Sequence, residues 1–194
     1  MDELIIDTGS NVVRENKIEP LQVFDDSHPM LKSVMPEYDV TTLPNTRMNE
    51  LASRLKLTMK LYSGLGLAAN QCGIQERVFV IGSEYFQMVC INPKIVKYSA
   101  EVEKRREGCL SSPGLFVNIS RSKSVDVEFY NELGELKQLT VDGITAQCFQ
   151  HELDHLNGIT FTSKVGPLAL QLAKQKQQKL IKKVIRAQKN GLRI

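Results

Sequence analysis

Two of the three histidines in this chain lie four residues apart, in the stretch Gln150-His151-Glu152-Leu153-Asp154-His155. In an α-helix, residues i and i+4 lie one turn apart on the same face, so both imidazoles would point in one direction. Two neutral imidazoles placed in this way can bind one divalent ion, and the adjacent Glu152 can handle a proton on ion-bound water. A surface helix that carries two histidines by chance is the alternative interpretation. The stretch therefore predicts a helix that forms part of a metal site.

Finding a third ligand would strengthen this prediction, and two cysteines are candidates. Cys109 lies in Glu107-Gly108-Cys109-Leu110-Ser111-Ser112-Pro113-Gly114, where glycine, serine and proline indicate a loop or bulge that leaves a thiolate accessible. Cys148 lies three residues before His151, but it is seven residues, about 10.5 Å along a helix axis, from His155. Three ligands spread over that length would not readily meet at one ion, so the spacing favours Cys109. A Cys, His, His set plus water is typical of catalytic zinc-type sites.

The composition indicates one globular domain. The chain has 194 residues, of which 42% are hydrophobic and 24% charged, and no apolar run approaches the roughly 20 residues of a membrane span. The first residues, Met1-Asp2-Glu3-Leu4, do not resemble a targeting leader. The four cysteines form no Cys-x-x-Cys pair, which favours free or metal-binding thiols in a reducing compartment. We therefore expect a cytoplasmic protein.

The net charge of +3 is unevenly distributed. From Val165 to the end there are eight basic residues and no acidic residue, so the rest of the chain is mildly acidic. Gly166-Pro167 can start a helix, no breaker follows until Asn190-Gly191, and that pair can cap the C-terminus. We assign residues 1–165 to the catalytic domain and residues 166–194 to a basic C-terminal helix that is not a separate domain. Such a helix is either a partly docked, solvated element or a contact for a polyanion.

The remaining patterns indicate an α+β fold. Residues up to about 45 are rich in proline and should be irregular, and His28 lies in a turn-like cluster where it would be solvated or act as a cap. An amphipathic helix is predicted from Thr46 to Tyr62, capped by Asn45 or Thr46. The predicted strands are Arg77–Ile81, Met88–Ile91, Lys94–Tyr98, Val125–Tyr130 and Leu136–Val141. The last two strands should form a hairpin before the histidine-bearing helix.

The stretch Gly64-Leu65-Gly66-Leu67-Ala68-Ala69-Asn70-Gln71 leaves its backbone open to close approach. One interpretation is a dinucleotide-binding loop of the Gly-x-Gly-x-x-Ala kind, but that motif should follow a strand and open a helix. Here it follows a predicted helix and precedes a predicted strand, so a backbone that another group approaches closely, or a plain structural turn, fits better.

Taken in order, the stretches Gly64–Gln71, Glu107–Ser111 and His151–His155 resemble the three signatures of the peptide deformylase family. The resemblance covers roughly residues 20 to 164. It implies hydrolysis of the N-formyl group from the formylmethionine of new polypeptides, with formate as a product. It also implies antiparallel sheets packed around a central metal-binding helix, with a C-terminal helix.

Carried over position by position, the resemblance makes Cys109, His151 and His155 the metal ligands and Glu152 the general acid and base. The oxyanion would be held by the Gln71 side-chain amide and the Leu110 backbone N–H. The residues implied to bind substrate are Leu65, Gly66, Gly108 and Cys148. Gln147 falls near the methionine pocket as well, but it is polar, and an outward orientation is the alternative. Asp154 is not a ligand in this scheme, and we expect Arg121 or Arg106 to pair with it.

The resemblance further implies one divalent ion per chain, with Fe2+ as the physiological metal and Zn2+, Ni2+ or Co2+ as other occupants. The expected partners are N-formylmethionyl peptides and, through the basic helix, the ribosome; we expect a monomer. Two other functions stay open. A His-Glu-x-x-His metallopeptidase usually takes a third ligand downstream, and no His, Cys, Asp or Glu follows His155. A non-catalytic ribosome- or RNA-binding module would have no need for Glu152 and Gln71.

Overall fold

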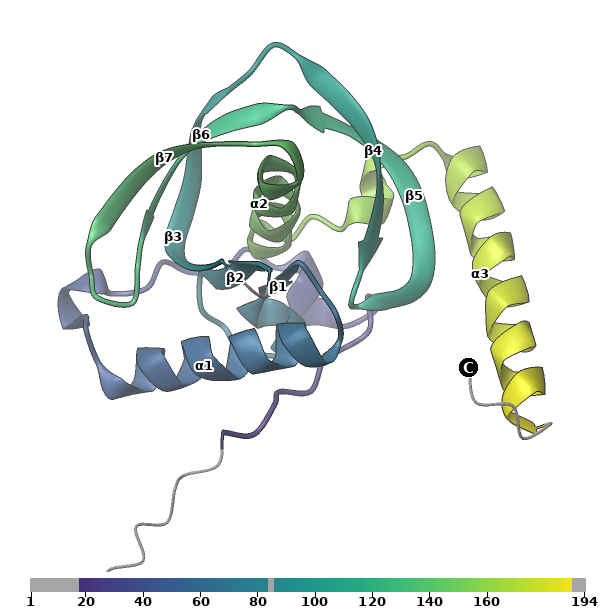
Figure 1. Cartoon of the computed structure of the whole chain (residues 1–194), viewed down its shortest axis with the longest axis horizontal. Helices are drawn as coiled ribbons and strands as arrows, with labels where there is room; N and C mark the ends of the chain where they lie inside the picture. The colour runs from purple at the N-terminus through teal and green to yellow at the C-terminus, as the bar shows by residue number, and fades with distance from the viewer. Residues whose placement is uncertain (1–17, 84–85, 190–194) are drawn as a thin grey trace, which may run out of the picture.

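A central helix, α2 (Gly143–Leu156), lies between two antiparallel sheets (Figure 1). The computed structural model describes residues 18–83 and 86–189. The larger sheet has the order β1-β2-β3-β6-β7, and the smaller sheet is the hairpin of β4 and β5. The strands are β1 (Gly66–Ala68), β2 (Val78–Gly82), β3 (Gln87–Tyr98), β4 (Val102–Cys109), β5 (Ser112–Ser122), β6 (Ser124–Tyr130) and β7 (Leu136–Asp142). The predicted α+β class is confirmed, as is the arrangement of antiparallel sheets around the histidine-bearing helix.

The first helix, α1 (Thr46–Leu61), covers the outer face of β1 and β2. Its N-cap is Asn45, whose side chain accepts a hydrogen bond of 2.8 Å from the Met48 N–H. Every third or fourth residue is apolar, and these positions are buried against the sheet: Met48, Leu51, Leu55 and Met59. The predicted helix and cap are confirmed, although Tyr62 lies just past the helix and is half exposed.

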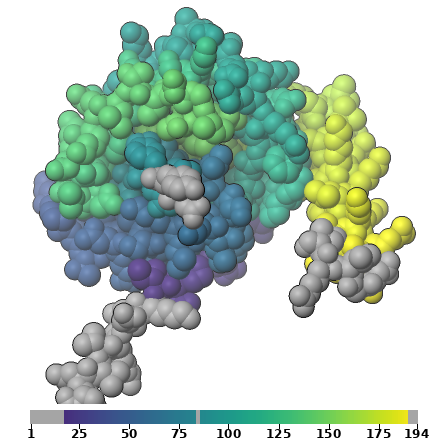
Figure 2. All heavy atoms as spheres, in the orientation of Figure 1, coloured from purple at the N-terminus to yellow at the C-terminus, as the bar shows by residue number. Residues whose placement is uncertain are grey.

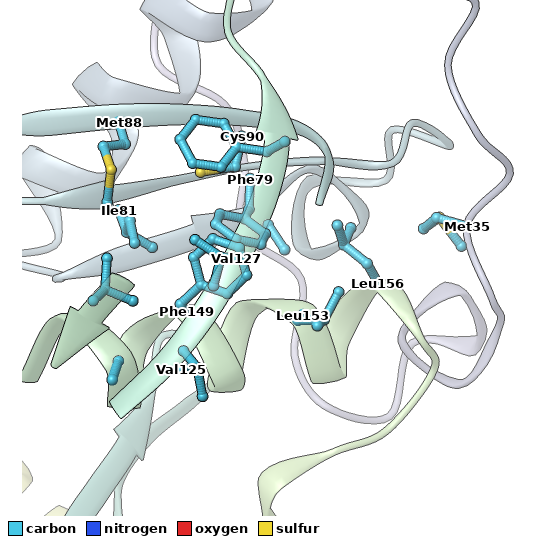
Figure 3. Packing of buried hydrophobic residues seen from close by; sticks show 14 residues of the cluster. Met35, Phe79, Ile81, Met88, Cys90, Val125, Val127, Phe149, Leu153 and Leu156 are labelled. Atoms are coloured by element: carbon cyan, nitrogen blue, oxygen red, sulfur yellow. The ribbon is translucent and has the colours of Figure 1, made fainter. Parts of the chain in front are cut away.

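The central helix is buried on both sides. One side packs on the larger sheet, where the Phe149 ring meets Phe79 edge-on at a centroid distance of 5.0 Å, with Leu153 and Leu156 further along (Figure 3). The opposite side carries the histidines and faces the β4–β5 hairpin. Because most of α2 is covered on both sides, its buried polar side chains have lost their hydration, and such groups are costly unless they gain a partner.

Two strand predictions require correction. The predicted strands Met88–Ile91 and Lys94–Tyr98 are one continuous strand, β3, whose register with β6 shifts between Ile91 and Lys94. At this bulge Asn92 has a φ of 50°, and its side chain makes two 2.8 Å hydrogen bonds to the Tyr38 backbone. The side chain therefore stabilises a conformation that ordinarily interrupts a strand.

Strands β4 and β5 were not predicted, because Val102 to Glu107 is mostly charged and lacks apolar alternation. Cys109 ends β4, where the pairing with β5 becomes irregular, so the expected bulge is present but within a hairpin. The predicted hairpin of β6 and β7 is confirmed. His28 caps the short 3-10 helix Pro29–Lys32, as one of its two interpretations predicted.

The last helix, α3 (Pro167–Lys189), lies against β5 at one side of the molecule (Figure 2). Ala173 is buried there beside Leu115, and the Gln177 amide donates a 2.8 Å hydrogen bond to the Pro113 carbonyl. The predicted cap at Asn190-Gly191 lies outside the described residues. Within the described ranges, no helix has the length and apolar character needed to cross a bilayer.

Candidate active site

The fold brings together one thiol and two imidazoles from two separate elements. Cys109 lies at the end of β4, whereas His151 and His155 lie one turn apart on α2. Their donor atoms all lie within 4.8 Å of one another, and Cys109 Sγ is 3.2 Å from His155 Nε2. Both histidines are buried. A soft thiolate and two imidazoles at this spacing fit a divalent transition metal. Cys148, the rival candidate, is not part of this cluster.

A buried carboxylate orients the first histidine. Glu107 Oε2 lies 3.0 Å from His151 Nδ1, so this nitrogen carries the proton and leaves Nε2 available for a metal. The Arg121 guanidinium binds both Glu107 oxygens, at 2.6 and 3.0 Å. Burial alone would raise the pKa of Glu107, but His151 and Arg121 outweigh burial and lower this pKa to about 2. Glu107 therefore stays ionised.

The Arg121 guanidinium also pairs with a carboxylate on α2. Arg121 Nη1 donates to Asp154 Oδ2 at 2.8 Å, and Lys164 Nζ lies 3.1 Å from the other Asp154 oxygen. Arg121 is thus the predicted partner of Asp154, whereas Arg106 instead stacks on the Phe116 ring at 4.0 Å. The network connects β4, β5 and α2 through charge-assisted hydrogen bonds.

Glu152 is buried beside the donor cluster and forms no ion pair with the described residues. Its Oε2 atom is buried and makes no hydrogen bond within the described part of the chain. Its Oε1 atom lies against the backbone of Gly66, where any Cβ would collide with the carboxylate. Burial is the largest influence on the pKa of Glu152 and raises it to about 7. A carboxylate with this pKa can both accept and release a proton near neutral pH.

Gln71 places an amide N–H group beside the cluster. Its Oε1 atom accepts a 2.8 Å hydrogen bond from the Ala68 N–H, which fixes the orientation of the amide. Its Nε2 atom then lies 3.4 Å from Cys109 Sγ and 3.2 Å from the Ser111 hydroxyl. The neighbouring Asn70 donates a 2.6 Å hydrogen bond to the His155 carbonyl and so connects the 3-10 helix Ala69–Cys72 to α2.

A cavity of about 500 Å³ opens onto these groups. Its walls include all four residues expected to bind substrate: Leu65, Gly66, Gly108 and Cys148. Gly108 lies under the Phe116 ring, where a Cβ would approach a ring carbon to 2.6 Å. Burial raises the pKa of the Cys148 thiol to about 12, so it stays protonated. Leu110, Gln71, His151 and Glu152 line the cavity as well.

Gln147 does not point outward. Its side chain is buried and lines the same cavity as Cys148 and His151. The alternative orientation considered for it is therefore wrong.

Sequence reasoning assigned no role to Glu107, Ser111 or Asn70. Glu107 could have been found from the alternation of β4, in which Lys104 and Arg106 are exposed whereas Glu107 faces inward. That signal depends on recognising β4 as a strand. No local pattern marks Ser111 or Asn70, because their partners lie 40 and 85 residues away.

Comparison with known proteins gives one consistent family. The polypeptide deformylase family model matches residues 20–171, which is more than half of the chain. A peptide deformylase of Prochlorococcus marinus (strain NATL1A) is 43% identical over 123 residues, covering 61% of this chain and 61% of that relative. The match thus spans less than two thirds of that relative's length.

Two crystal structures extend this likeness to the fold. A peptide deformylase from Synechococcus elongatus in complex with actinonin has a TM-score of 0.76 and 34% identity, covering 82% of this chain and 86% of that chain. The peptide deformylase from Thermotoga maritima has a TM-score of 0.71 and 35% identity, covering 77% and 99%. With the match of the family model over residues 20–171, these similarities establish that the chain belongs to the polypeptide deformylase family.

Proposed function

We propose that this protein removes the N-formyl group from the N-terminal formylmethionine of newly made polypeptides. The observation that carries the proposal is the position of Glu152, buried beside the Cys109, His151 and His155 donors at a cavity of about 500 Å³. The reaction is a hydrolysis: the water oxygen bonds to the formyl carbon, the carbon–nitrogen bond breaks, and formate and a free amine leave.

The three donors would hold one divalent ion, for which we propose Fe2+ in the cell, with Zn2+, Ni2+ and Co2+ as other occupants of the same ligands. When bound, the ion supplies Lewis-acid chemistry, activating water and polarising the formyl carbonyl. Glu107 supports this binding by holding the His151 proton on Nδ1, so that Nε2 faces Cys109. A half-buried thiol and two buried imidazoles converge there, which is a donor set that suits such an ion.

Glu152 acts as the general base and then as the general acid. It takes a proton from the attacking water and passes it to the departing amine nitrogen; burial, which raises the pKa of Glu152, favours its holding that proton between the two transfers. The Gln71 amide and the Leu110 backbone N–H stabilise the negative charge on the formyl oxygen. Loss of one such donor commonly lowers kcat by about 10²–10³.

The peptide would lie along β1. This strand is at the edge of its sheet and, among the described strands, pairs with β2 alone, so its other edge can exchange backbone hydrogen bonds with an extended chain. Leu65 and Gly66 line the cavity from this edge, which supports a role for Gly66 in binding the substrate backbone. The first side chain would then enter the cavity past Gly108 and Cys148.

Formate release from a formyl-Met peptide, by protein prepared in ferrous iron without oxygen, tests this function. Activity in the parent should fall by about 10²–10⁴ in Glu152→Ala, which removes the proton carrier. Metal content should persist in Glu152→Ala and drop in Cys109→Ser. No release from the metal-loaded parent, or parent-like release from Glu152→Ala, would contradict the proposal.

We also propose that the protein acts as a cytoplasmic monomer that contacts the ribosome through α3. One chain supplies the three donors, Glu152 and the cavity walls, which supports a monomer. Most lysines of α3 are exposed and can meet phosphates, so binding should weaken steeply with salt.

Size-exclusion chromatography tests the monomer, and co-sedimentation with ribosomes at two salt concentrations tests the contact. Lys182→Glu with Lys183→Glu should reduce co-sedimentation and leave deformylation of a short peptide unchanged. Equal co-sedimentation of parent and variant at low salt would contradict the contact.

A further inference from the structure

The two groups assigned above to the oxyanion come from separate parts of the chain. Gln71 lies on the 3-10 helix Ala69–Cys72. Leu110 lies in the short turn that joins Cys109 at the end of β4 to Ser112 at the start of β5. The tip of a hairpin is usually one of the more mobile parts of a sheet. An oxyanion donor, however, is effective only when it is already in place, so this turn needs support from other parts of the protein.

Residues near the start of the described chain bind both of these places from outside the cavity. The Phe24 N–H donates a 2.8 Å hydrogen bond to the Gln71 carbonyl. The Asp26 N–H donates a 2.9 Å hydrogen bond to the carbonyl of Ser111, the residue that follows Leu110 in the turn. Neither Phe24 nor Asp26 lines the cavity. A short segment outside the substrate space is therefore connected to both oxyanion groups.

Side chains complete a closed ring of hydrogen bonds between this segment, the turn and the 3-10 helix. Ser112 Oγ donates to Asp26 Oδ2 at 2.8 Å. Gln71 Nε2 donates to Ser111 Oγ at 3.2 Å and so joins the helix directly to the turn. Both serines are buried, so water does not compete for these bonds. In a closed network each hydrogen bond restrains the others, and the ring therefore fixes the turn relative to the helix.

The preceding residue is a carboxylate of a different kind. Asp25 is exposed and accepts a 2.9 Å hydrogen bond from the Ser27 N–H within its own turn. The Asp26 side chain is half-buried and binds a residue 86 positions further along the chain, at the start of β5. Asp25 thus stabilises local structure, whereas Asp26 connects the segment to the site.

We propose that Asp26 is a positioning residue that fixes the two oxyanion donors relative to each other, an inference that rests on the deformylase function proposed above. The Asp26 carboxylate holds Ser112 and, through the turn, the Leu110 N–H. The backbone of the same segment holds Gln71. Loss of the carboxylate frees the turn to shift, and a misplacement of about 1 Å at a reacting group can lower a rate by as much as about 10²-fold.

Steady-state kinetics of the metal-loaded protein on a formyl-Met peptide test the proposal. Asp26→Ala should lower kcat by about 3- to 10-fold, as expected for one hydrogen bond, and should leave KM and metal content at the parent's values. Asp26→Asn keeps an acceptor oxygen for Ser112 and should retain most of the parent's kcat. The matched control is Asp25→Ala, which removes the adjacent carboxylate and should keep the parent's kcat.

A second variant removes the same hydrogen bond from the other side. Ser112→Ala should lower kcat as Asp26→Ala does, and it replaces that variant if Asp26→Ala does not fold. Combining the two changes should lower kcat by less than about 2-fold beyond either one alone, because they remove one shared contact.

Several results would overturn the proposal while leaving the deformylase function intact. They are a parent-like kcat in both Asp26→Ala and Ser112→Ala, an equal loss of kcat in Asp25→Ala, a rise in KM in place of the fall in kcat, or fully additive losses in the double variant. Absence of formate with the metal-loaded parent would overturn the deformylase function as well.

Discussion

Helices α2 and α3 use polar residues in opposite ways. Of the 14 residues of α2, nine are buried, and they include Gln147, Gln150, His151, Glu152 and His155. In the 23 residues of α3, Ala173 is the one buried residue. Polar groups on α2 have lost their hydration, so their hydrogen bonds and ion pairs within the protein are strong. Removing one of these contacts therefore lowers the free energy of unfolding substantially. The charges of α3 remain hydrated, and their contacts add little to stability.

This comparison also separates two kinds of function. A buried helix can shift pKa values, as it does for Glu152, because its environment excludes water. A solvated helix cannot shift pKa values in this way, but it can present charged side chains to a large partner without disturbing the fold. Changes in the free energy of unfolding measure this contrast.

The largest effect is expected for Arg121→Met. This change leaves the buried Glu107 and the half-buried Asp154 without their shared cation, so the free energy of unfolding should fall by about 3–5 kcal/mol. Urea denaturation measures the loss. A loss below about 1 kcal/mol would mean that the ion pairs of Arg121 with Glu107 and Asp154 contribute no more than a surface ion pair does.

The next effect is the pH dependence that Glu107 confers. Its pKa is about 2 in the folded protein, below the ordinary value of 4.5, so its contribution is complete above pH 4.5 and is lost as the pH falls toward 2. The difference in unfolding free energy between the parent and Glu107→Gln should shrink by an amount on the order of 3 kcal/mol over that range. Measurements in a chelator keep metal release from contributing. A difference that does not change with pH would contradict the assignment.

A smaller effect is expected for Asp154→Asn. The amide keeps the shape but removes the charge that Arg121 and Lys164 share, which should cost about 1–2 kcal/mol. Metal content, measured on the same sample, should not change because Asp154 is not in the ligand cluster. Unchanged stability would refute the contribution of Asp154 to the network with Arg121 and Lys164.

The smallest effect is expected on α3. Leu180 is 46% exposed, so Leu180→Ala should lower the unfolding free energy by less than about 1 kcal/mol. Leu156→Ala removes the same atoms from a fully buried position of α2 and serves as the control, with an expected loss of about 2–5 kcal/mol. Similar losses in both variants would show that α3 is packed more tightly than its exposure indicates.

Periodic segments of this fold were predictable, and segments that depend on distant partners were not. The apolar spacing of Met48, Leu51, Leu55 and Met59 predicted α1, because the pattern and the buried face coincide. Strand β4 was not predicted because its charged residues have low strand propensity. Its pairing with β5 stabilises it instead.

The residues of the candidate site also fall into those that local sequence predicts and those that depend on distant partners. The spacing of His151 and His155 on one helix is local, so the sequence alone predicted their convergence. The ionised, buried Glu107 was not predicted, since its burial depends on Arg121, 14 residues further along the chain. The burial of Gln147 in the cavity wall is likewise a property of the assembled fold.

The separation of the donors along the chain has a consequence for folding. Cys109 and His155 are 46 residues apart in sequence and 3.2 Å apart in space. An ion bound to both would close that stretch into a loop, as a disulfide closes one, and would remove about 4 kcal/mol of chain entropy from the unfolded state. The ion would then act as a crosslink as well as a cofactor, and unfolding of the hairpin from α2 would be inseparable from its release.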